Sequence, residues 1–460
     1  MSIECTCQPV FGLTQDSKQN ALWAASGFTG SPGQTLMTLS AEVPVLLVGL
    51  GPVEQVTTGS LREVAALAGR VLSDAVSASW DFESLSLLAL PSRKIAQSIA
   101  EGVTLGSYRP GTDADRKTQW QVPEGHSEAW SLGLAIGRAT VRTRNLVNSP
   151  PNVLTPRAFA AHCEQTANEH GLVVRVYSQA DLISLGFGGI LAIGGGSIEP
   201  SLMIEVTHEG ASIKPDLSLV GKGVTFDSGG LSLKGAEDMI GMKHDMAGAA
   251  AVFEAMTLLP LLAPTLHVKA YLPVVENLPG QGAARPGDVV TMRNGRTVEI
   301  LNTDFEGRVI LADALAYAAE EGPAAIIDLA TLTNAAVRAL GERTAALMSS
   351  HERLSELVRK AAESSDEPVW ELPMPGYLGE QLKSDIADYK NFPGTANARA
   401  LTAAMFLRAF IPGEIPWVHL DIAGPAWAAE PYGLTTAGGT GFGVRLLAGL
   451  FQTFTSQTVS

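Results

Sequence analysis

Apolar residues follow two alternating periods along the chain and predict an α/β protein. VPVLLVGLG (43–51) is a continuous apolar run that ends in glycine, which predicts a buried strand. SLREVAALAGRVLSDAV (60–76) begins with a capping serine and has apolar residues at helical spacing, so we expect a helix. SLSLLAL (84–90) predicts a further strand, and the charged residues 111–124 predict a loop or hairpin.

A helical pattern over residues 127–145 ends at NSPPNVLTP (148–156), because adjacent prolines do not fit a helix. We place a domain boundary there, with a small N-terminal α/β domain at 1–144 and a larger α/β domain at 145–460. In the larger part, strand-like runs (GGILAIGGGS, LSLVGKGVTF, HVKAYLPVVEN, AAIIDLATLT) alternate with helical stretches (MAGAAAVFEAMTLL, RVILADALAYAAEE). This alternation predicts a mostly parallel central sheet with helices on its faces.

Composition and charge narrow the possible functions. The 460 residues are 46% apolar, which is enough for more than one core. The formal net charge of -15 argues against binding to nucleic acid or to an anionic membrane, since both require a basic face. The three cysteines offer no disulfide framework, and no secretory signal or membrane-spanning run is found. We therefore expect a soluble, cytoplasmic protein.

Two clusters of polar residues stand where predicted strands end and helices begin, which is where α/β sheets carry their sites. The first, within residues 220–250, contains Lys222, Asp227, Lys234 and Asp245. The second, NTDFEGR (302–308), contains Asp304, Glu306 and Arg308. Side chains two apart on an extended segment point the same way, so we expect Asp304 and Glu306 to converge on one point.

Converging carboxylates repel one another unless a cation lies between them, and four of them suffice for two divalent ions. One lysine can then ligate a metal as the neutral amine, while the other stays charged and stabilises an oxyanion. Two ions that share a water provide both a nucleophile and a Lewis acid. The simpler interpretation is an acidic helix N-terminus, which explains Asp304 and Glu306 but not the first cluster.

Other motifs in the sequence are weaker indications of function. TFDSGG (225–230) is similar to the GDSGG of chymotrypsin-like proteases, but the α/β pattern does not fit their fold, so we do not expect Ser228 to be a nucleophile. The glycine-rich run at 188–197 lacks both nucleotide-binding patterns. His244, next to Asp245, is expected to point away from a metal, and His419 to lie in a core strand.

The two clusters resemble the metal segments of the leucyl aminopeptidase family, the cytosol aminopeptidases or peptidase family M17. NTDFEGR is similar to the family signature NTDAEGR, and VGKGVTFDSGG with MKHDMAGAA is similar to the other metal segment. The similarity continues through LVNSPPNVLTP, QLKSDIADYKN, LTAAMFL, WVHLDIAG and GGTGFGVRLL, from about residue 145 to the C-terminus. It implies a dinuclear metal-dependent aminopeptidase that releases N-terminal residues from peptides through a metal-activated water.

The resemblance also implies roles for single residues. Two divalent ions, Mn²⁺ or Zn²⁺, would be ligated by Lys222, Asp227, Asp245, Asp304 and Glu306. Lys234 would polarise the substrate carbonyl, and Arg308 would hold a bicarbonate that acts as general base. The pocket for the departing side chain would be lined by Met242, Thr331 and Asn334. The family further implies a homohexamer whose active sites face an interior cavity.

Several positions depart from the family pattern. Phe305 replaces an alanine between two ligands, and we expect it to pack away from the metals. Asn334 replaces a glycine, which should narrow or polarise the pocket and puts a leucine preference in doubt. Arg399 and Ala400 depart from a run of small residues. Because all seven site positions are intact, we expect an active enzyme; the alternative is a scaffold or DNA-binding protein of the same fold.

Overall fold

The computed structural model describes residues 4–11, 25–40, 43–110, 118–413 and 415–459. The chain divides into two compact units, Met1–Arg142 with Ala429–Ala437, and Thr143–Ala428 with Gly438–Ser460. Both contain strands and helices, which confirms the predicted two-domain α/β class. The boundary between residues 144 and 145 stays a prediction. Within the described ranges, no helix is long and apolar enough to cross a membrane.

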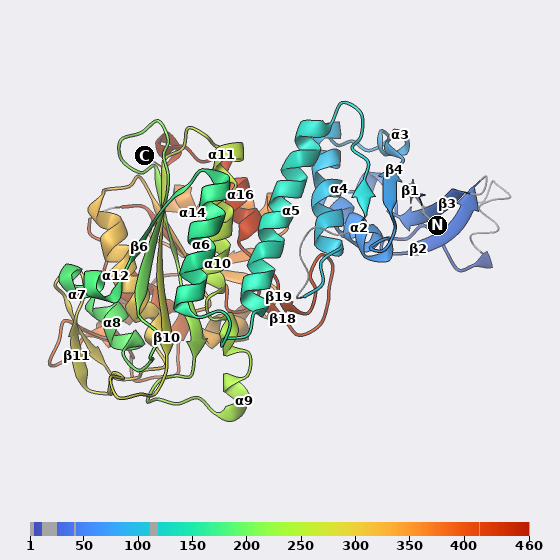
Figure 1. Ribbon diagram of the computed structural model, residues 1–460. Helices are drawn as coiled ribbons and strands as arrows, with labels where there is room; N and C mark the ends of the chain where they lie inside the picture. The colour runs from blue at the N-terminus through green and yellow to red at the C-terminus, as the bar shows by residue number, and fades with distance from the viewer. Residues whose placement is uncertain (1–3, 12–24, 41–42, 111–117, 414, 460) are drawn as a thin grey trace. The chain divides into compact units, whose positions relative to one another are not determined.

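The N-terminal unit has a five-stranded sheet in the order β2-β3-β1-β4-β5, in which only the β2–β3 pair is antiparallel (Figure 1). Its strands are β1 (Glu4–Val10), β2 (Thr35–Ser40), β3 (Val43–Gly49), β4 (Ser77–Trp80) and β5 (Gln119–Trp120). Its helices are α2 (Thr58–Val71), α3 (Phe82–Leu85) and α4 (Ser92–Gly106), and α5 (Ser127–Asn148) contains the division point. The predicted strand at 43–51, helix at 60–76 and helix at 127–145 are confirmed.

Two predictions for this unit need correction. The strand predicted at 84–90 is wrong, because Asp81 accepts hydrogen bonds from the backbone and hydroxyl of Ser84 and so caps the short helix α3. The cap of α2 is Thr57, while Ser60 completes a capping box from the third helical position. Of the predicted loop, residues 111–117 lie outside the described residues.

The larger unit contains a nine-stranded sheet in the order β15-β14-β17-β13-β8-β10-β7-β6, with β9 paired to β10. Its strands are β6 (Val173–Tyr177), β7 (Leu202–His208), β8 (Leu217–Gly221), β9 (Gly223–Asp227), β10 (Val268–Asn277), β13 (Ile326–Ala330), β14 (Ala345–Ser349), β15 (Val369–Glu371) and β17 (Trp417–Asp421). The central strands β17, β13, β8 and β10 are parallel, as predicted. Smaller sheets join β11 (Asp288–Thr291), β12 (Thr297–Ile300) and β16 (Tyr389–Lys390), and β18 (Trp427–Ala428) with β19 (Gly438–Gly439).

The helices of this unit surround the central strands. They are α6 (Pro156–His170), α7 (Gln179–Leu185), α8 (Gly188–Gly194), α9 (Ala236–Met239), α10 (Ala247–Met256), α11 (Leu259–Leu262), α12 (Glu306–Glu320), α13 (Asn334–Leu340), α14 (Glu352–Ser365), α15 (Arg399–Arg408) and α16 (Val444–Phe451). The strand predicted at 188–197 is wrong, since it is the helix α8. The buried carboxylate of Asp313 accepts the backbone N–H of Ile190 at 3.0 Å and so satisfies the first turn of this helix.

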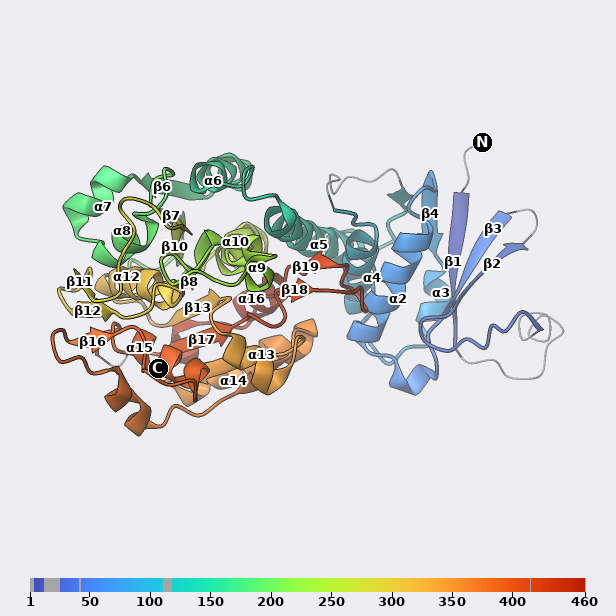
Figure 2. The ribbon, with the colours of Figure 1, turned by 90° about the horizontal axis from the view of Figure 1, so that it is seen from below.

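The strand order shows that successive crossover connections lead to opposite sides of β8. The chain passes from β8 through α10 to β10 on one side, and then from β10 through α12 to β13 on the other side of β8. Because such parallel crossovers are right-handed, α10 and α12 cover opposite faces of the sheet, as Figure 2 shows. The carboxyl ends of β8 and β13 therefore flank a switch point, the usual place for a site in this fold class.

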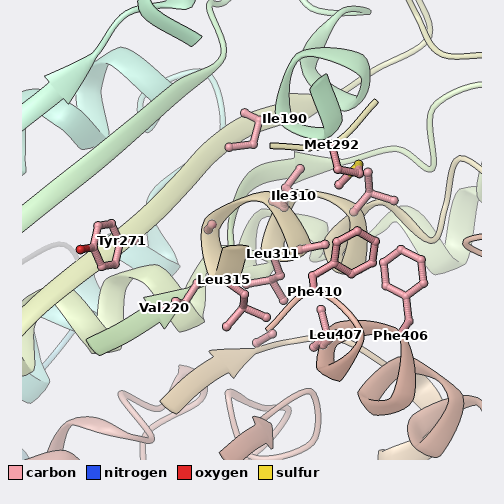
Figure 3. Packing of buried hydrophobic residues seen from close by; sticks show 14 of the residues in the cluster. Ile190, Val220, Tyr271, Met292, Ile310, Leu311, Leu315, Phe406, Leu407 and Phe410 are labelled. Carbon is pink, nitrogen blue, oxygen red and sulfur yellow. The ribbon is translucent and has the colours of Figure 1, made fainter. Parts of the chain in front are cut away.

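The main core of this unit lies between the sheet and α12. Leu311 and Leu315 of α12 lie between Val220 of β8 and two further residues, Leu407 of α15 and Phe410 just beyond its end (Figure 3). On the opposite face, α10 approaches the strands closely because its first turn consists of small residues. A Cβ at Gly248 would lie 2.1 Å from the carbonyl oxygen of Leu329.

We predict that Gly248→Ala lowers the free energy of unfolding by about 1–3 kcal/mol, because the added methyl group forces α10 away from β13. Denaturant unfolding of the full chain measures this change. The matched control is Gly376→Ala, where a Cβ has no neighbour within 4 Å and stability should stay within about 0.5 kcal/mol. Equal free energies of unfolding for the two variants would show that the close approach of Gly248 to β13 does not contribute to stability.

Candidate metal centre

The first predicted cluster lies at the switch point. Lys222 lies between the strands β8 and β9, and its side chain is 3% exposed. Its Nζ lies 2.7 Å from Asp245 Oδ1 and 2.7 Å from Glu306 Oε1, and it donates to the Thr331 carbonyl at 2.9 Å. Thr331 Oγ1 donates to the same oxygen of Asp245 at 2.8 Å. One ammonium group therefore joins the start of α10, the start of α12 and the end of β13.

A second ammonium group joins the remaining carboxylates. Lys234 Nζ lies 2.9 Å from Asp227 Oδ2 and also contacts Asp304 Oδ1. Asp227 is fixed from its other oxygen, which accepts Gly229 N at 2.9 Å and Asn277 Nδ2 at 2.8 Å. All four predicted carboxylates and both lysines thus lie in one connected cluster, as the sequence predicted.

The geometry of the second cluster differs from the prediction. Asp304 and Glu306 do not lie on an extended segment, because a turn at residues 303–304 leads directly into α12, which begins at Glu306. The side chain of Asn302 accepts the backbone N–H of Asp304 at 2.8 Å, which stabilises this turn. The two carboxylates still reach the cluster, Glu306 through Lys222 and Asp304 through Lys234.

Hydrogen bonds join the loop after Asp227 (228–235) to the loop that carries Asp304 (301–305); we call these the two acidic loops. Thr303 Oγ1 donates to the Gly229 carbonyl at 2.6 Å and accepts Ser232 N at 2.7 Å. Gly229 and Gly230 have φ values of +85° and +61°, a conformation that favours glycine. At Gly230 a Cβ would lie 2.7 Å from Asn277 Oδ1, so space as well as backbone conformation requires glycine there.

Two buried asparagines, which the sequence analysis missed, hold these loops. Asn391 Oδ1 accepts the backbone N–H of Leu301 at 2.9 Å, and its Nδ2 donates to the Asn302 carbonyl at 2.7 Å. Asn277 Nδ2 donates to the Thr303 carbonyl as well as to Asp227. Asn277 ends a predicted strand, which was a usable signal because sites gather at such ends. Asn391 ends the family-like segment QLKSDIADYKN, but that resemblance assigned it no role.

The burial of so many charges shifts their pKa values. Burial opposes the charge of Lys222 and of Lys234, but the neighbouring carboxylates outweigh burial and raise the pKa of both amines above its ordinary value. Burial raises the pKa of Asp304 to about 6 and that of Asp245 well above its usual range, although each has a lysine partner. Four carboxylates exceed two ammonium groups, so the cluster favours further positive charge.

The donor set fits a divalent cation. Asp227, Asp245 and Glu306 are buried, and one ligand oxygen from each lies within 4.8 Å of the others. Asp245 Oδ2 is buried and has no hydrogen-bond partner among the described residues. Carboxylate oxygens of this kind suit Mn²⁺ and Zn²⁺. Asp304 lies outside this compact trio and reaches it through Lys234, which also contacts Asp227.

Arg308 lies in the first turn of α12 and is 2% exposed. It donates from Nη1 to the Asn391 carbonyl at 3.1 Å and lies 4.6 Å from the centre of the Phe305 ring. Burial lowers the pKa of Arg308 to about 9, which leaves the guanidinium charged at neutral pH. The Phe305 ring packs edge to face on Phe392 at 5.0 Å, so the predicted packing role of Phe305 is confirmed.

The three predicted pocket residues occupy different places. Thr331 is buried against Asp245, as described above. Met242 is half-buried in a short 3₁₀ helix immediately before Asp245. Asn334 is exposed at the start of α13.

Three other residues that the sequence singles out are Ser228, His244 and His419. The Ser228 hydroxyl donates to the Asn277 carbonyl at 2.7 Å, which engages its proton with the backbone. His244 Nδ1 lies 2.6 Å from the Gly241 carbonyl oxygen. His419 is fully buried in β17 and pairs with Asp328, so its predicted place in a core strand is confirmed.

Sequence comparison identifies the family. Residues 141–448 match the catalytic domain of the cytosol aminopeptidase family, and residues 13–111 match the N-terminal domain of that family. A probable cytosol aminopeptidase of Syntrophotalea carbinolica is 43% identical over 93% of this chain and 90% of its own length. One from Aquifex aeolicus is 39% identical over 95% of this chain and 91% of its own length.

Solved structures agree with this assignment. The bottromycin maturation enzyme BotP in complex with Mn superimposes with a TM-score of 0.92 at 40% identity, covering 98% of this chain and 99% of that chain. A mutant of tomato leucine aminopeptidase superimposes with a TM-score of 0.85 at 28% identity, covering 98% of this chain and 94% of that chain. This chain therefore belongs to the cytosol aminopeptidase family, peptidase family M17, and is a hydrolase of the leucyl aminopeptidase type.

Proposed function

We propose that this protein is a dinuclear metal-dependent aminopeptidase that releases N-terminal amino acids from peptides. The observation that carries the proposal is the buried trio of Asp227, Asp245 and Glu306, in which one Asp245 oxygen has no hydrogen-bond partner among the described residues. Two bound divalent ions would supply an activated water and polarise the scissile carbonyl.

The proposed metal ligands are one lysine and four carboxylates of the cluster: Lys222, Asp227, Asp245, Asp304 and Glu306. Lys222 would ligate as the neutral amine, so its ammonium group gives up a proton to the solvent when an ion binds. The Thr331 carbonyl and the Asp245 carboxylate already hold its Nζ in place, which orients the amine for that role.

Lys234 is proposed to remain charged and to donate to the substrate carbonyl oxygen as negative charge develops on it. Its side chain is 14% exposed, compared with 3% for Lys222, so it is the lysine that a substrate can reach. Arg308 is proposed to hold a bicarbonate that accepts a proton from the water. A buried guanidinium whose hydrogen bond within the described part of the chain goes to a neutral group, the Asn391 carbonyl, is suited to bind an oxyanion.

We also propose that the subunits form a homohexamer in the cytoplasm, that the metal is Mn²⁺ or Zn²⁺, and that a pocket at Met242, Thr331 and Asn334 receives the departing side chain. The family assignment and the name of the curated relatives support assembly and location. The Mn complex of BotP supports the choice of metal.

We predict that Asp304→Ala abolishes cleavage of leucyl anilides, with a loss of at least about a thousandfold in kcat/KM, because one proposed ligand is removed. Metal analysis of the purified variant should show fewer ions per subunit than in the wild type. Asp288→Ala is the matched control, since this carboxylate pairs with Arg285 at the surface. Full activity and full metal content in Asp304→Ala would exclude the proposed ligand set.

Lys234→Met should behave differently. We expect turnover to fall by about a hundredfold or more, because the charge that stabilises the developing oxyanion is lost, while the metal content stays that of the wild type. Anilide kinetics and metal analysis on the same sample measure both quantities. If the metal is lost together with the activity, Lys234 holds the site together instead of acting on the substrate.

Asn334→Gly is predicted to change specificity without changing metal content. The substitution removes an exposed side chain from the start of α13, and an additional methylene group bound in a pocket contributes about tenfold. The ratio of kcat/KM for leucyl over alanyl anilide should therefore rise by about tenfold. An unchanged ratio would mean that Asn334 does not border the pocket.

A further inference from the structure

Two arginines and two phenylalanines form a cluster beside the proposed metal ligands. The Cζ atoms of Arg308 and Arg399 lie 4.6 Å and 5.4 Å from the centre of the Phe305 ring. Arg399 Cζ also lies 5.7 Å from the centre of the Phe392 ring, which packs on Phe305. We call these four residues the arginine–phenylalanine cluster.

The two guanidinium groups of the cluster attract anions, although the charges of Glu306 and Asp421 act on Arg308 from beyond ion-pair distance. Among the described residues, neither guanidinium lies within 4.0 Å of a carboxylate, and their hydrogen bonds go to neutral carbonyl groups. Arg308 donates to Asn391 O at 3.1 Å, and Arg399 Nε donates to Thr395 O at 3.3 Å. A guanidinium has five N–H donors, so most donors of this pair remain available. Two like charges around one ring favour an anion from outside the chain.

The place of the cluster indicates where that anion would sit. Arg308 and the proposed ligand Glu306 lie in the same first turn of α12, and Arg399 approaches the same Phe305 ring as Arg308, so the cluster adjoins the proposed ligands. Arg399 is half-buried, which leaves its guanidinium within reach of a substrate. Arg308 is committed to an oxyanion in the proposed function, so Arg399 is the arginine that remains for a substrate.

We propose that Arg399 is a specificity-determining residue that favours peptides with a carboxylate on the residue after the scissile bond. This carboxylate is the free C-terminus of a dipeptide or an acidic side chain at that position. The pocket on the other side of the scissile bond is proposed at Met242, Thr331 and Asn334, which leaves the cluster for the leaving residue. The inference rests on the proposed aminopeptidase function.

The chemistry of the cluster supports this choice of ligand. A guanidinium presents a planar pair of donors that matches the two oxygens of a carboxylate, whereas an amide offers one oxygen and no charge. The rings of Phe305 and Phe392 hold the Arg399 guanidinium by cation–π contact and so reduce the ordering that substrate binding requires. Hydrogen bonds of this charge-assisted kind correspond to about a tenfold effect on binding.

The test compares Leu-Gly with Leu-Gly-amide on the full chain loaded with Mn²⁺. For the wild type we expect a KM about tenfold lower for the dipeptide. In Arg399→Gln the two KM values should become equal, through a rise for the dipeptide alone, with kcat unchanged. Arg399→Lys should retain part of the difference. The matched control is Arg359→Gln, which removes an arginine that pairs with Glu371 at the surface and should leave the difference intact.

Two further pairs of substrates test on which side of the scissile bond the carboxylate is recognised. Leu-Glu-amide should show the Arg399-dependent advantage over Leu-Gln-amide, whereas Glu-Leu-amide should show none over Gln-Leu-amide. An advantage confined to the N-terminal acidic residue would overturn the proposal.

Three further outcomes distinguish a failure of this proposal from a failure of the proposed function. If Arg399→Gln slows all substrates equally, Arg399 holds a free oxyanion only and the specificity proposal is wrong. The same conclusion follows if wild-type KM values for Leu-Gly and Leu-Gly-amide are equal. If the Mn²⁺-loaded wild type cleaves none of these substrates, the aminopeptidase function itself fails.

Discussion

The pairing of two ammonium groups, one buried and one half-buried, with four carboxylates is the interaction on which the catalytic unit depends. Lys222 and Lys234 between them contact every carboxylate of the cluster. Removing either amine would leave carboxylates buried without a counter-charge, which is strongly unfavourable. The excess of acid over base is the feature that suits the same cluster to divalent cations, since an ion can supply the missing positive charge.

The fold brings the members of this cluster together from distant parts of the chain. The strands β8 and β13 supply Lys222 and Thr331 at their carboxyl ends, on the line where the chain reverses its direction across the sheet. The two acidic loops are joined by the hydrogen bonds of Thr303. The buried side chains of Asn277 and Asn391 also donate hydrogen bonds to the backbone of the loop that carries Asp304. Hydrogen bonds of neutral side chains thus position the loops that carry the proposed ligands.

Much of this arrangement could be predicted from the sequence. The strand–helix alternation predicted the central strands, and the polar residues after those strands predicted the cluster. The errors have identifiable physical causes. Residues 188–194 form a helix because Asp313, more than a hundred residues away, satisfies its first turn. Residues 302–305 form a turn because the side chain of Asn302 competes for the backbone of Asp304. The role of Asn391 could not be found, because its contacts lie about ninety residues away and the family-like segment that it ends does not indicate them.

Anomalous diffraction from crystals of the full chain grown with Mn²⁺ would show whether the acidic cluster binds two ions. We expect two manganese peaks in each subunit, enclosed by the oxygens of the acidic cluster and by Lys222 Nζ. Well-ordered crystals with no peak there, or with Lys222 and Lys234 still paired to the carboxylates at saturating manganese, would contradict this expectation.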